Sequence, residues 1–426
     1  MSYLKVKQAP CVIVDSFIAD NDVFSLFDTP INILFLDAFI DNITKFKNIF
    51  ERFSMPNNIF FSCKANKSLA FLKFATKNGC GIEVSSYYEL IDALKYTNKI
   101  IASGPAKNVE YLNLAINNEV AISVDDIKEL EEIIKLNSEV AVLLRISDLL
   151  NITSRFGIGI SQIDACLKLI KNSKIKLLGF SFHINGYNLD DRVSAIIKLL
   201  TIIKDKDLEI KYIDIGGGLP VNYCSKRDYD NFIKNNNERL YFKNRKISSF
   251  YPYYSETAGE QALSYILEKV NNKLDGIEII VEPGRSLLNN CGISIYKVEY
   301  LKNLPSGDNL VVTNGNINCL SEQWFNTDYL IEPELFKREK TKKLSLPIFA
   351  SVAGNLCLEQ DMLTWRKIKF DYLPENGDYL IYYNTAGYQM DSNESTFHKI
   401  PLVQKMVVKK AGKGYKIKKD ADYDCK

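Results

Sequence analysis

The sequence predicts an α/β fold in which a closed barrel of eight parallel strands is joined to a second, mostly antiparallel β domain. Two observations lead to this prediction. Short apolar runs rich in Ile, Val and Phe alternate with helical segments through the first two thirds of the chain, as buried parallel strands and their crossover helices do. Beyond residue 285, apolar and polar residues alternate, which is typical of antiparallel strands.

Eight apolar runs are the candidate barrel strands. They follow a helix expected near 40–54, and helical segments such as 68–77 and 109–118 lie between them. Eight strands separated by helices favour a closed barrel, and an open doubly wound sheet is the alternative that the pattern leaves. In chain order the runs are Phe60–Ala65, Gly81–Ser86, Ile100–Gly104, Ala121–Asp125, Val140–Ile146, Leu177–Ile184, Tyr212–Gly216 and Glu278–Glu282.

The rest of the chain is assigned to the β domain. The segment 222–254 is polar and aromatic without a clear period, and we expect it to be an insertion after the seventh barrel strand. These assignments place the barrel at 39–284 and the β domain at 1–38 and 285–426. Its expected strands are Ile293–Tyr300, Asn309–Thr313, Asp378–Tyr383 and Val403–Lys409, with the N-terminal runs Cys11–Val14 and Ile31–Asp37 pairing with them.

Composition narrows the class of protein. The 426 residues carry 54 basic and 52 acidic side chains, a net charge of +2 that argues against nucleic acid or an anionic membrane as partner. The nine cysteines are scattered without a C-x-x-C pair, so we expect reduced thiols and no zinc site. No run approaches the roughly 18 apolar residues of a membrane helix, and the N-terminus lacks the apolar core of a signal peptide. We expect a cytoplasmic protein.

A barrel places its chemistry where strands end, and polar residues follow the predicted strands there. Lys64 ends the first strand, where a lysine is costly to bury unless it is paired or chemically used. A lysine that simply emerges into solvent is the simpler alternative. His183, one of two histidines, ends the sixth strand, and its flat ring suits the face of a flat cofactor better than a core position.

Two further motifs follow the seventh and eighth strands. The glycines of 216–218 let backbone N–H groups converge on an anion, although a glycine triplet alone also describes a tight turn. In Glu282-Pro283-Gly284-Arg285, the arginine can clamp a phosphate and the carboxylate can hold a protonated ring nitrogen, unless the two simply pair with each other. Together with Lys64, these motifs describe a site for a phosphorylated aldehyde with a basic ring.

The chain resembles the fold-type III decarboxylases that use pyridoxal 5'-phosphate (PLP), the family of diaminopimelate, ornithine and arginine decarboxylases. The resemblance extends from about residue 31 to about residue 407, and it implies an alanine racemase-like fold. The markers occur in the family's order: Phe61-Ser62-Cys63-Lys64-Ala65-Asn66, Glu83-Val84-Ser85-Ser86-Tyr87-Tyr88-Glu89, Ser181-Phe182-His183-Ile184, Asp214-Ile215-Gly216-Gly217-Gly218, Glu282-Pro283-Gly284-Arg285-Ser286, Cys357 with Asp361, and Gly377-Asp378 leading to Ala386-Gly387-Tyr388.

The resemblance implies PLP as cofactor and a homodimer with shared active sites. Lys64 would carry PLP as a Schiff base, Glu282 would keep the ring nitrogen protonated, and Cys357 of the partner subunit would protonate the α-carbon. A protonated ring stabilises the carbanion that loss of carbon dioxide leaves, and a thiol can then act as the acid. The other implied cofactor contacts are Glu83 and Arg145 near the Schiff base, His183 on the ring face, and Gly217, Gly218, Arg285 and Tyr388 at the phosphate, with Gly284 beside them.

The sequence departs from the family at two motifs. The histidine motif usually continues with Gly-Ser, but here Asn185-Gly186-Tyr187 follow, so one phosphate hydroxyl is missing. In the familiar decarboxylases an acid that binds the distal amine directly follows the catalytic cysteine. Here Leu358 follows, and the acid has moved to Glu359, although Asp361 still matches the family's later aspartate.

The segment 388–399 is similar to a subgroup that includes siderophore-pathway decarboxylases of citryl-diamino acids. In those substrates the distal amine is an amide and carries carboxylates. His398, Lys399 and Arg366 are candidates for the positive groups that would bind such a tail, although ordinary surface charge is the favoured interpretation of each one taken alone.

We therefore expect a decarboxylase of an L-diamino acid, with a preference for an N-citrylornithine type of substrate in siderophore (rhizoferrin-like) biosynthesis. Free ornithine, lysine, arginine or diaminopimelate, as in polyamine or lysine biosynthesis, is the first alternative. A racemase or epimerase is the second, and Glu282 argues against it because a racemase on this scaffold is expected to place an arginine at the ring nitrogen. A regulatory protein without catalysis is disfavoured by the presence of Lys64, Glu282, Arg285 and Cys357.

Overall fold

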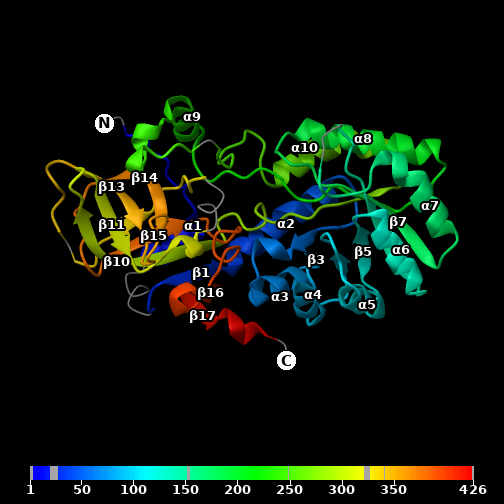
Figure 1. The fold of residues 1–426 in the computed structure, drawn as a ribbon, viewed down its shortest axis with the longest axis horizontal. Helices are drawn as coiled ribbons and strands as arrows, with labels where there is room; N and C mark the ends of the chain where they lie inside the picture. The colour runs from blue at the N-terminus through cyan, green and yellow to red at the C-terminus, as the bar shows by residue number, and fades with distance from the viewer. Residues whose placement is uncertain are drawn as a thin grey trace. The chain divides into compact units, whose positions relative to one another are not determined.

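The computed structural model of the chain describes residues 3–19, 27–150, 154–247, 249–320, 327–339 and 341–424. The chain divides into two compact units (Figure 1). We call one the barrel unit, which consists of Ile40–Leu219, Thr257–Leu287 and Tyr423–Lys426. The other is the β unit, which consists of Met1–Phe39, Pro220–Glu256 and Leu288–Asp422. The domain boundaries at 39 and 284 remain a prediction.

The barrel unit contains eight parallel strands that pair in chain order. The first and last strands are joined by a parallel bridge, in which the backbone N–H of Phe60 donates to Val281 at 2.9 Å and that of Val281 donates to Asn58 at 3.1 Å. The predicted eight-stranded parallel barrel is thereby confirmed. The strands are β2 (Phe60–Ser62), β3 (Gly81–Val84), β4 (Ile100–Ala102), β5 (Ala121–Val124), β6 (Val140–Arg145), β7 (Ile175–Ser181), β8 (Tyr212–Asp214) and β9 (Glu278–Ile280).

Helices surround these strands, and side-chain caps fix where several of them begin. Ser86 and Asp126 accept hydrogen bonds from backbone N–H groups in the first turns of α4 and α6. In both helices a glutamate three residues later, Glu89 or Glu129, accepts the N–H of the residue before the cap at 2.6 and 2.7 Å. The helices are α2 (Leu36–Arg52), α3 (Leu69–Lys77), α4 (Tyr87–Leu94), α5 (Val109–Asn117), α6 (Ile127–Lys135), α7 (Ile163–Lys171), α8 (Leu189–Asp205) and α10 (Glu260–Val270).

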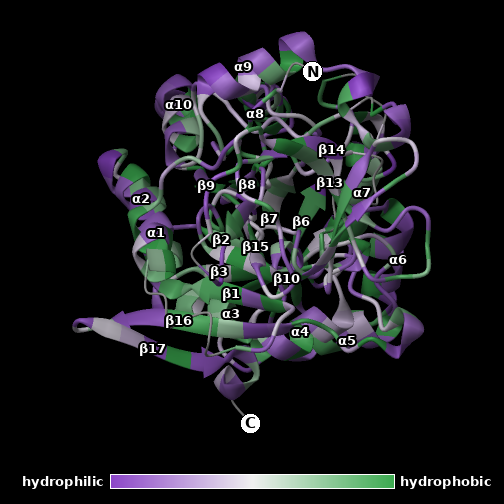
Figure 2. Ribbon diagram, turned by 90° about the vertical axis from the view of Figure 1, so that its left-hand side faces the viewer, coloured by the Kyte–Doolittle hydropathy of each residue, from purple (hydrophilic) through white to green (hydrophobic). Residues whose placement is uncertain are grey.

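The barrel interior is filled by apolar side chains from different strands. Phe60, Ile101, Leu143 and Ile280 form one buried cluster. Figure 2 shows the hydrophobic colour on several of these strands and hydrophilic patches on the outer helices. The strands are thus packed on a solid core, which leaves their carboxyl ends and the following loops to form a site.

The β unit is built on a nine-stranded sheet in which most neighbours are antiparallel. Two pairs, β1 with β16 and β11 with β13, are parallel. The hairpin of β16 and β17 is largely hydrophilic, as Figure 2 shows. The strands are β1 (Ile31–Phe35), β10 (Gly292–Asn303), β11 (Asn309–Thr313), β12 (Glu334–Phe336), β13 (Ile348–Ala353), β14 (Met362–Phe370), β15 (Tyr379–Tyr383), β16 (Gln404–Ala411) and β17 (Gly414–Lys419).

The predicted N-terminal strand Cys11–Val14 is wrong, because this segment opens helix α1 (Val12–Ala19). Val14 and Phe17 are buried three positions apart, as on one face of a helix. The carboxylate of Asp15 also accepts the backbone N–H of Cys11 at 3.0 Å, which removes that donor from any strand ladder. The predicted run from Ile31 does form β1, which pairs with β10 and β16.

The segment 222–254, which shows no clear period in the sequence, contains helix α9 (Lys226–Asn235) within the β unit. Ser225 caps this helix by accepting the N–H of Asp228 at 3.2 Å. Phe232 is its one buried residue. Tyr229, Phe232 and Ile233 have helical spacing, but they cover only about one turn, which is too short a pattern to predict the helix. Among the described helices of the chain, none has the length and hydropathy that a membrane span requires.

Candidate active site

A cavity of about 290 Å³ opens at the carboxyl ends of the barrel strands. It brings together Lys64, Glu83, Arg145, His183 and Glu282, all of which the sequence predicts as site residues. Its full lining is Lys64, Glu83, Ser85, Ser103, Gly104, Pro105, Ser123, Arg145, Arg155, Phe156, Ser181, Phe182, His183, Asp214 and Glu282.

Lys64 lies in a short 3-10 turn directly after β2, and its side chain is 41% exposed. Its Nζ is 3.0 and 3.1 Å from the two carboxylate oxygens of Glu83, which is fully buried on β3. Ser62 and Ser85 donate to the same carboxylate at 2.5 and 3.0 Å. Burial alone would raise the pKa of Glu83, but the charge of Lys64 and these hydrogen bonds together lower it. The amine is therefore held in place while it stays accessible from the cavity.

Two buried carboxyl groups, Asp214 at the end of β8 and Glu282 after β9, hydrogen-bond to each other. Burial raises the pKa of Asp214 to about 6. Burial, with the negative charges of Asp214 and Glu83, raises the pKa of Glu282 well above its ordinary value. Each carboxyl group therefore binds a proton more tightly than an exposed one, and a protonated ring nitrogen beside Glu282 would supply a positive charge that stabilises its ionised form.

The side chain of His183 lies exposed on the cavity wall. Protein atoms and several cationic side chains surround it. Desolvation of the imidazole by the surrounding protein, followed by the charges of Lys64, Arg145 and Arg192, lowers the pKa of His183 to about 4. A Cβ atom on Gly216, whose φ is +65°, would lie 2.7 Å from Nδ1 of this histidine. A glycine at 216 therefore leaves room for a neutral, flat imidazole.

We expect His183 of the apoprotein to titrate near pH 4. Its pKa in the folded protein lies below the unfolded value of about 6.5, so the unfolded chain binds the proton more tightly between these values. His183 therefore makes the folded protein less stable as the pH falls from about 6.5 toward 4. The imidazole NMR signals measure this directly, because a His398→Gln variant keeps a single histidine. A midpoint at 6 or above would contradict the neutral ring.

The glycine loop after β8 offers backbone donors. Gly216 and Gly218 have φ of +65° and +71°, and a Cβ atom on Gly217 would lie 2.5 Å from the carbonyl of Glu282. In the part of the chain that the structure describes, no hydrogen bond uses the N–H of Gly217 or Gly218, whereas that of Gly216 donates to Asp214 at 2.8 Å. Two free N–H groups on a loop that only glycine fits suit a phosphate.

Not every predicted residue lines this cavity. Gly284 and Arg285 follow β9 in the barrel unit, the first buried and the second half-buried. The other predicted residues belong to the β unit, and their part in the site remains a prediction: Cys357, Glu359, Asp361, Tyr388 and His398. Cys357 and His398 are exposed there, and Tyr388 is half-buried with φ of +71°.

The sequence prediction missed several residues that line the cavity. Asp214 belongs to a recognised marker but was given no role, although it ends a strand as Lys64 does. Ser123 and Ser181 are joined by a hydrogen bond of 2.9 Å between β5 and β7. The signal that identifies all three is the same: each lies at or near the carboxyl end of a barrel strand.

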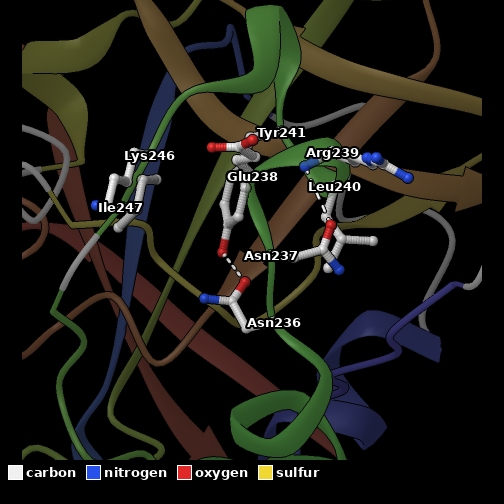
Figure 3. Close-up of a pocket in the computed structure, with 8 residues that line it drawn as sticks. All are labelled: Asn236, Asn237, Glu238, Arg239, Leu240, Tyr241, Lys246 and Ile247. Atoms are coloured by element: carbon white, nitrogen blue, oxygen red, sulfur yellow. Dashed lines mark hydrogen bonds between the residues drawn. The ribbon is translucent and has the colours of Figure 1, made fainter.

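A larger cavity, of about 720 Å³, lies in the β unit and is lined by residues 236–241, Lys246 and Ile247 (Figure 3). Two of its polar side chains make hydrogen bonds within the loop. Asn236 accepts the hydroxyl of Tyr241 at 2.8 Å, and Asn237 accepts the N–H of Arg239 at 3.1 Å. None of the site residues predicted from the sequence lines this cavity. Among the described residues, no cluster of His, Cys, Asp and Glu is arranged to hold a metal ion.

Comparison with known proteins places this geometry in a family. Residues 36–289 match the family described as "Pyridoxal-dependent decarboxylase, pyridoxal binding domain". The chain is 31% identical over 400 residues to the uncharacterized protein y4yA of Sinorhizobium fredii, which covers 89% of this chain and 88% of that protein. It is 25% identical over 365 residues to the diaminopimelate decarboxylase of Haemophilus influenzae, with 79% of each chain covered.

Solved structures show the same fold. The diaminopimelate decarboxylase of M. jannaschii in complex with L-lysine has a TM-score of 0.75 at 20% identity, covering 94% of this chain and 92% of that one. SrLDC in complex with PLP and cadaverine has a TM-score of 0.72 at 17% identity, covering 95% of both chains. The barrel and β sheet together are thus the alanine racemase-like decarboxylase fold. The chain belongs to the pyridoxal-dependent decarboxylase family, and it is a PLP-dependent amino-acid decarboxylase.

Proposed function

We propose that the chain removes the α-carboxylate of an L-diamino acid whose distal amine carries a carboxylate-bearing acyl group, of the N-citrylornithine type. We place this reaction in siderophore (rhizoferrin-like) biosynthesis, in a cytoplasmic homodimer whose partner subunits share active sites. The observation that carries the proposal is that the acidic residues after Cys357 are already bound within the protein. In a decarboxylase of a free diamino acid, these acids would bind the distal ammonium.

Both of those acids already have partners. Glu359 is exposed and pairs with Lys243 at 2.6 Å. Asp361 is buried, and its two oxygens accept the backbone N–H groups of Ile317 at 2.7 Å and Leu356 at 2.6 Å. Burial raises the pKa of Asp361 to about 6. A carboxylate that is committed to two loop N–H groups is a weaker receptor for a substrate ammonium, which favours a substrate whose distal amine is an amide.

Cationic groups in the barrel unit suit a tail that carries carboxylates. A second cavity, of about 470 Å³, shares Arg145, Arg155 and Phe156 with the lining of the Lys64 cavity. The guanidinium groups of both arginines lie over the Phe156 ring, at 4.6 and 4.0 Å from its centre. Arg145 pairs with Asp125 at 3.0 Å, whereas no carboxylate among the described residues pairs with Arg155. Arg155 is therefore our candidate for binding a substrate carboxylate.

The expected role of Arg366 is wrong. This arginine is buried on β14, where it donates to the carbonyls of Leu4 at 2.6 Å and Leu330 at 2.7 Å and pairs with Glu332 at 3.4 Å. It holds segments of the β unit together and is not available to a substrate. His398 and Lys399 are exposed, and the positive field of His398 reaches Asp361, so both remain candidates.

The donor set of the barrel unit fits PLP, which when bound withdraws electrons from the α-carbon as the carboxylate leaves. In our proposal Lys64 binds the aldehyde carbon, and Glu83 fixes the amine. Glu282 keeps the ring nitrogen protonated, and His183 packs on the ring. The phosphate would be held by Gly217, Gly218, Gly284, Arg285 and Tyr388. Arg145 would lie near the bond between Lys64 and the cofactor, and Cys357 of the partner subunit would donate a proton to the α-carbon.

The main alternative is a decarboxylase of a free diamino acid. It is favoured by relatives such as the diaminopimelate decarboxylase of Haemophilus influenzae. A racemase is disfavoured, because the acidic pair of Asp214 and Glu282 supports a protonated ring and hence a strong electron sink.

The test compares release of carbon dioxide by purified, PLP-loaded enzyme from ornithine, N-acetylornithine and N-citrylornithine. We expect the citryl compound to react fastest, and the acetyl compound separates the effect of acylation from that of the carboxylates. Turnover of ornithine alone would overturn the proposal and favour a polyamine enzyme. Uptake of heavy-water label without release of carbon dioxide would indicate a racemase.

An Arg155→Met variant tests the carboxylate contact. We expect kcat/KM for N-citrylornithine to fall by about tenfold or more, because a charge-assisted hydrogen bond is lost, while N-acetylornithine is little affected. Arg239→Met, on the loop of the β unit in Figure 3, is the matched control. Equal decreases of kcat/KM for both substrates in the Arg155 variant would contradict a role of Arg155 in binding the carboxylates of the citryl group.

A further inference from the structure

Arg192 is a fully buried cation at the glycine loop. It is the fourth residue of α8 and has no exposed surface. Its Nε has no hydrogen-bond partner. Burial lowers the pKa of Arg192, and the charges of Tyr187 and Asp191 partly oppose this effect. A buried guanidinium is costly unless something compensates its charge, so the position of Arg192 needs an explanation.

All of the hydrogen bonds that Arg192 makes within the described chain go to backbone carbonyls. Nη1 donates to Asn188 at 3.2 Å. Nη2 lies 3.3 and 3.1 Å from the carbonyls of Ile184 and Gly186, in the loop after β7. The same nitrogen reaches the loop after β8, and its acceptors there are the carbonyls of Gly217 at 3.3 Å and Gly218 at 2.9 Å. One side chain thus joins the two loops.

These contacts determine where the backbone N–H groups of the glycine loop point. In a trans peptide the carbonyl and the N–H point in opposite directions. The carbonyl of Gly217 points at Arg192, so the N–H of Gly218 points away from it, and the N–H of Leu219 is likewise directed by the carbonyl of Gly218. Neither N–H has a hydrogen-bond partner within the described residues. Arg192 thus presents these two donors to a ligand on the opposite side of the loop.

The loop that Arg192 joins to the glycines is the one in which the sequence departs from its family. Residues 185–187 are Asn-Gly-Tyr in place of the usual Gly-Ser. A Cβ atom on Gly218 would lie 2.5 Å from Nη2 of Arg192, so the guanidinium occupies space directly against the loop backbone. A positive charge this close behind the loop would attract a phosphate on its other side.

We propose that Arg192 is a positioning residue for the phosphate of PLP, which orients the N–H groups of Gly218 and Leu219 and places a positive charge behind them. The proposal does not depend on which amino acid is the substrate. A purely structural link between the two loops would hold the apoprotein together without distinguishing phosphorylated from unphosphorylated ligands.

The test titrates apoprotein with PLP and with pyridoxal, which lacks the phosphate. For Arg192→Met we expect the dissociation constant for PLP to rise by about tenfold or more and that for pyridoxal to change little. Arg52→Met, which breaks a surface ion pair with Glu268 in the same unit, is the control and should change neither constant.

Arg192→Lys keeps a charge but lacks the planar group that spans both loops, so it covers the case in which the methionine variant does not fold. We expect it to lose affinity for PLP by several-fold, again with pyridoxal little changed. Equal losses for both ligands, or unchanged affinity for PLP, in whichever variant folds would overturn the proposal.

Discussion

Replacement of Lys64 by alanine is expected to reduce decarboxylation by about 10³-fold or more, because no other described amine lies in the cavity to bind the cofactor covalently. The visible absorbance of covalently attached PLP should disappear with it. The variant also leaves Glu83 buried without its cation, so some loss of stability accompanies the loss of activity.

Lys64→Arg separates these two effects. It keeps the ion pair with Glu83 but cannot form a Schiff base, so we expect it to be as inactive as the alanine variant and close to the wild type in thermal stability. Lys67→Ala, on the same segment, should retain activity and absorbance. Attached cofactor in a Lys64 variant would mean that another lysine carries it.

The second large effect concerns the proposed homodimer. Cys357→Ala is expected to lower kcat by about 10²-fold or more, the contribution of a positioned general acid. If each site combines Lys64 of one subunit with Cys357 of its partner, mixing the inactive Lys64→Ala and Cys357→Ala proteins should restore about a quarter of wild-type activity. Half of the dimers would then be mixed, and each mixed dimer has one intact site of two.

The control for that experiment is Cys11→Ala, which changes another accessible thiol of the β unit and should remain active. Mixing must be preceded by conditions under which subunits exchange, shown with two tagged wild-type chains. If subunits exchange and activity does not return, the two residues act within one chain, and the shared-site proposal fails.

The barrel was predictable because its strands are buried on both faces and read as continuous apolar runs. Lys64, His183 and Glu282 were predictable for a related reason, since polar residues at the ends of such runs must lie at one end of the barrel. Glu83 lies within β3 and was predicted only from the family resemblance. The prediction for residues 12–14 was wrong because a short Val-Ile-Val run has no period that distinguishes a strand from a helix. Phe17 is buried on the same helix face as Val14, and this burial stabilises the helix.

Arg192 and Arg366 mark the limit of sequence reasoning. An arginine near a helix start or within a strand is most simply a surface charge. These two side chains are buried where backbone carbonyls from distant parts of the sequence accept their hydrogen bonds. Gly218 is such an acceptor for Arg192, and Leu4 is one for Arg366. No periodicity carries that information, because it arises only when the loops are folded against each other.

The most direct test of the site is to locate the cofactor chemically. PLP-loaded enzyme would be reduced with borohydride, which makes the lysine–cofactor bond permanent, then digested and analysed by mass spectrometry. Our account predicts a single modified peptide, with the pyridoxyl group on Lys64. Modification at a different lysine, or no modification in protein that still releases carbon dioxide, would contradict the account. The cavity at the carboxyl ends of strands β2 to β9 would then not be the active site.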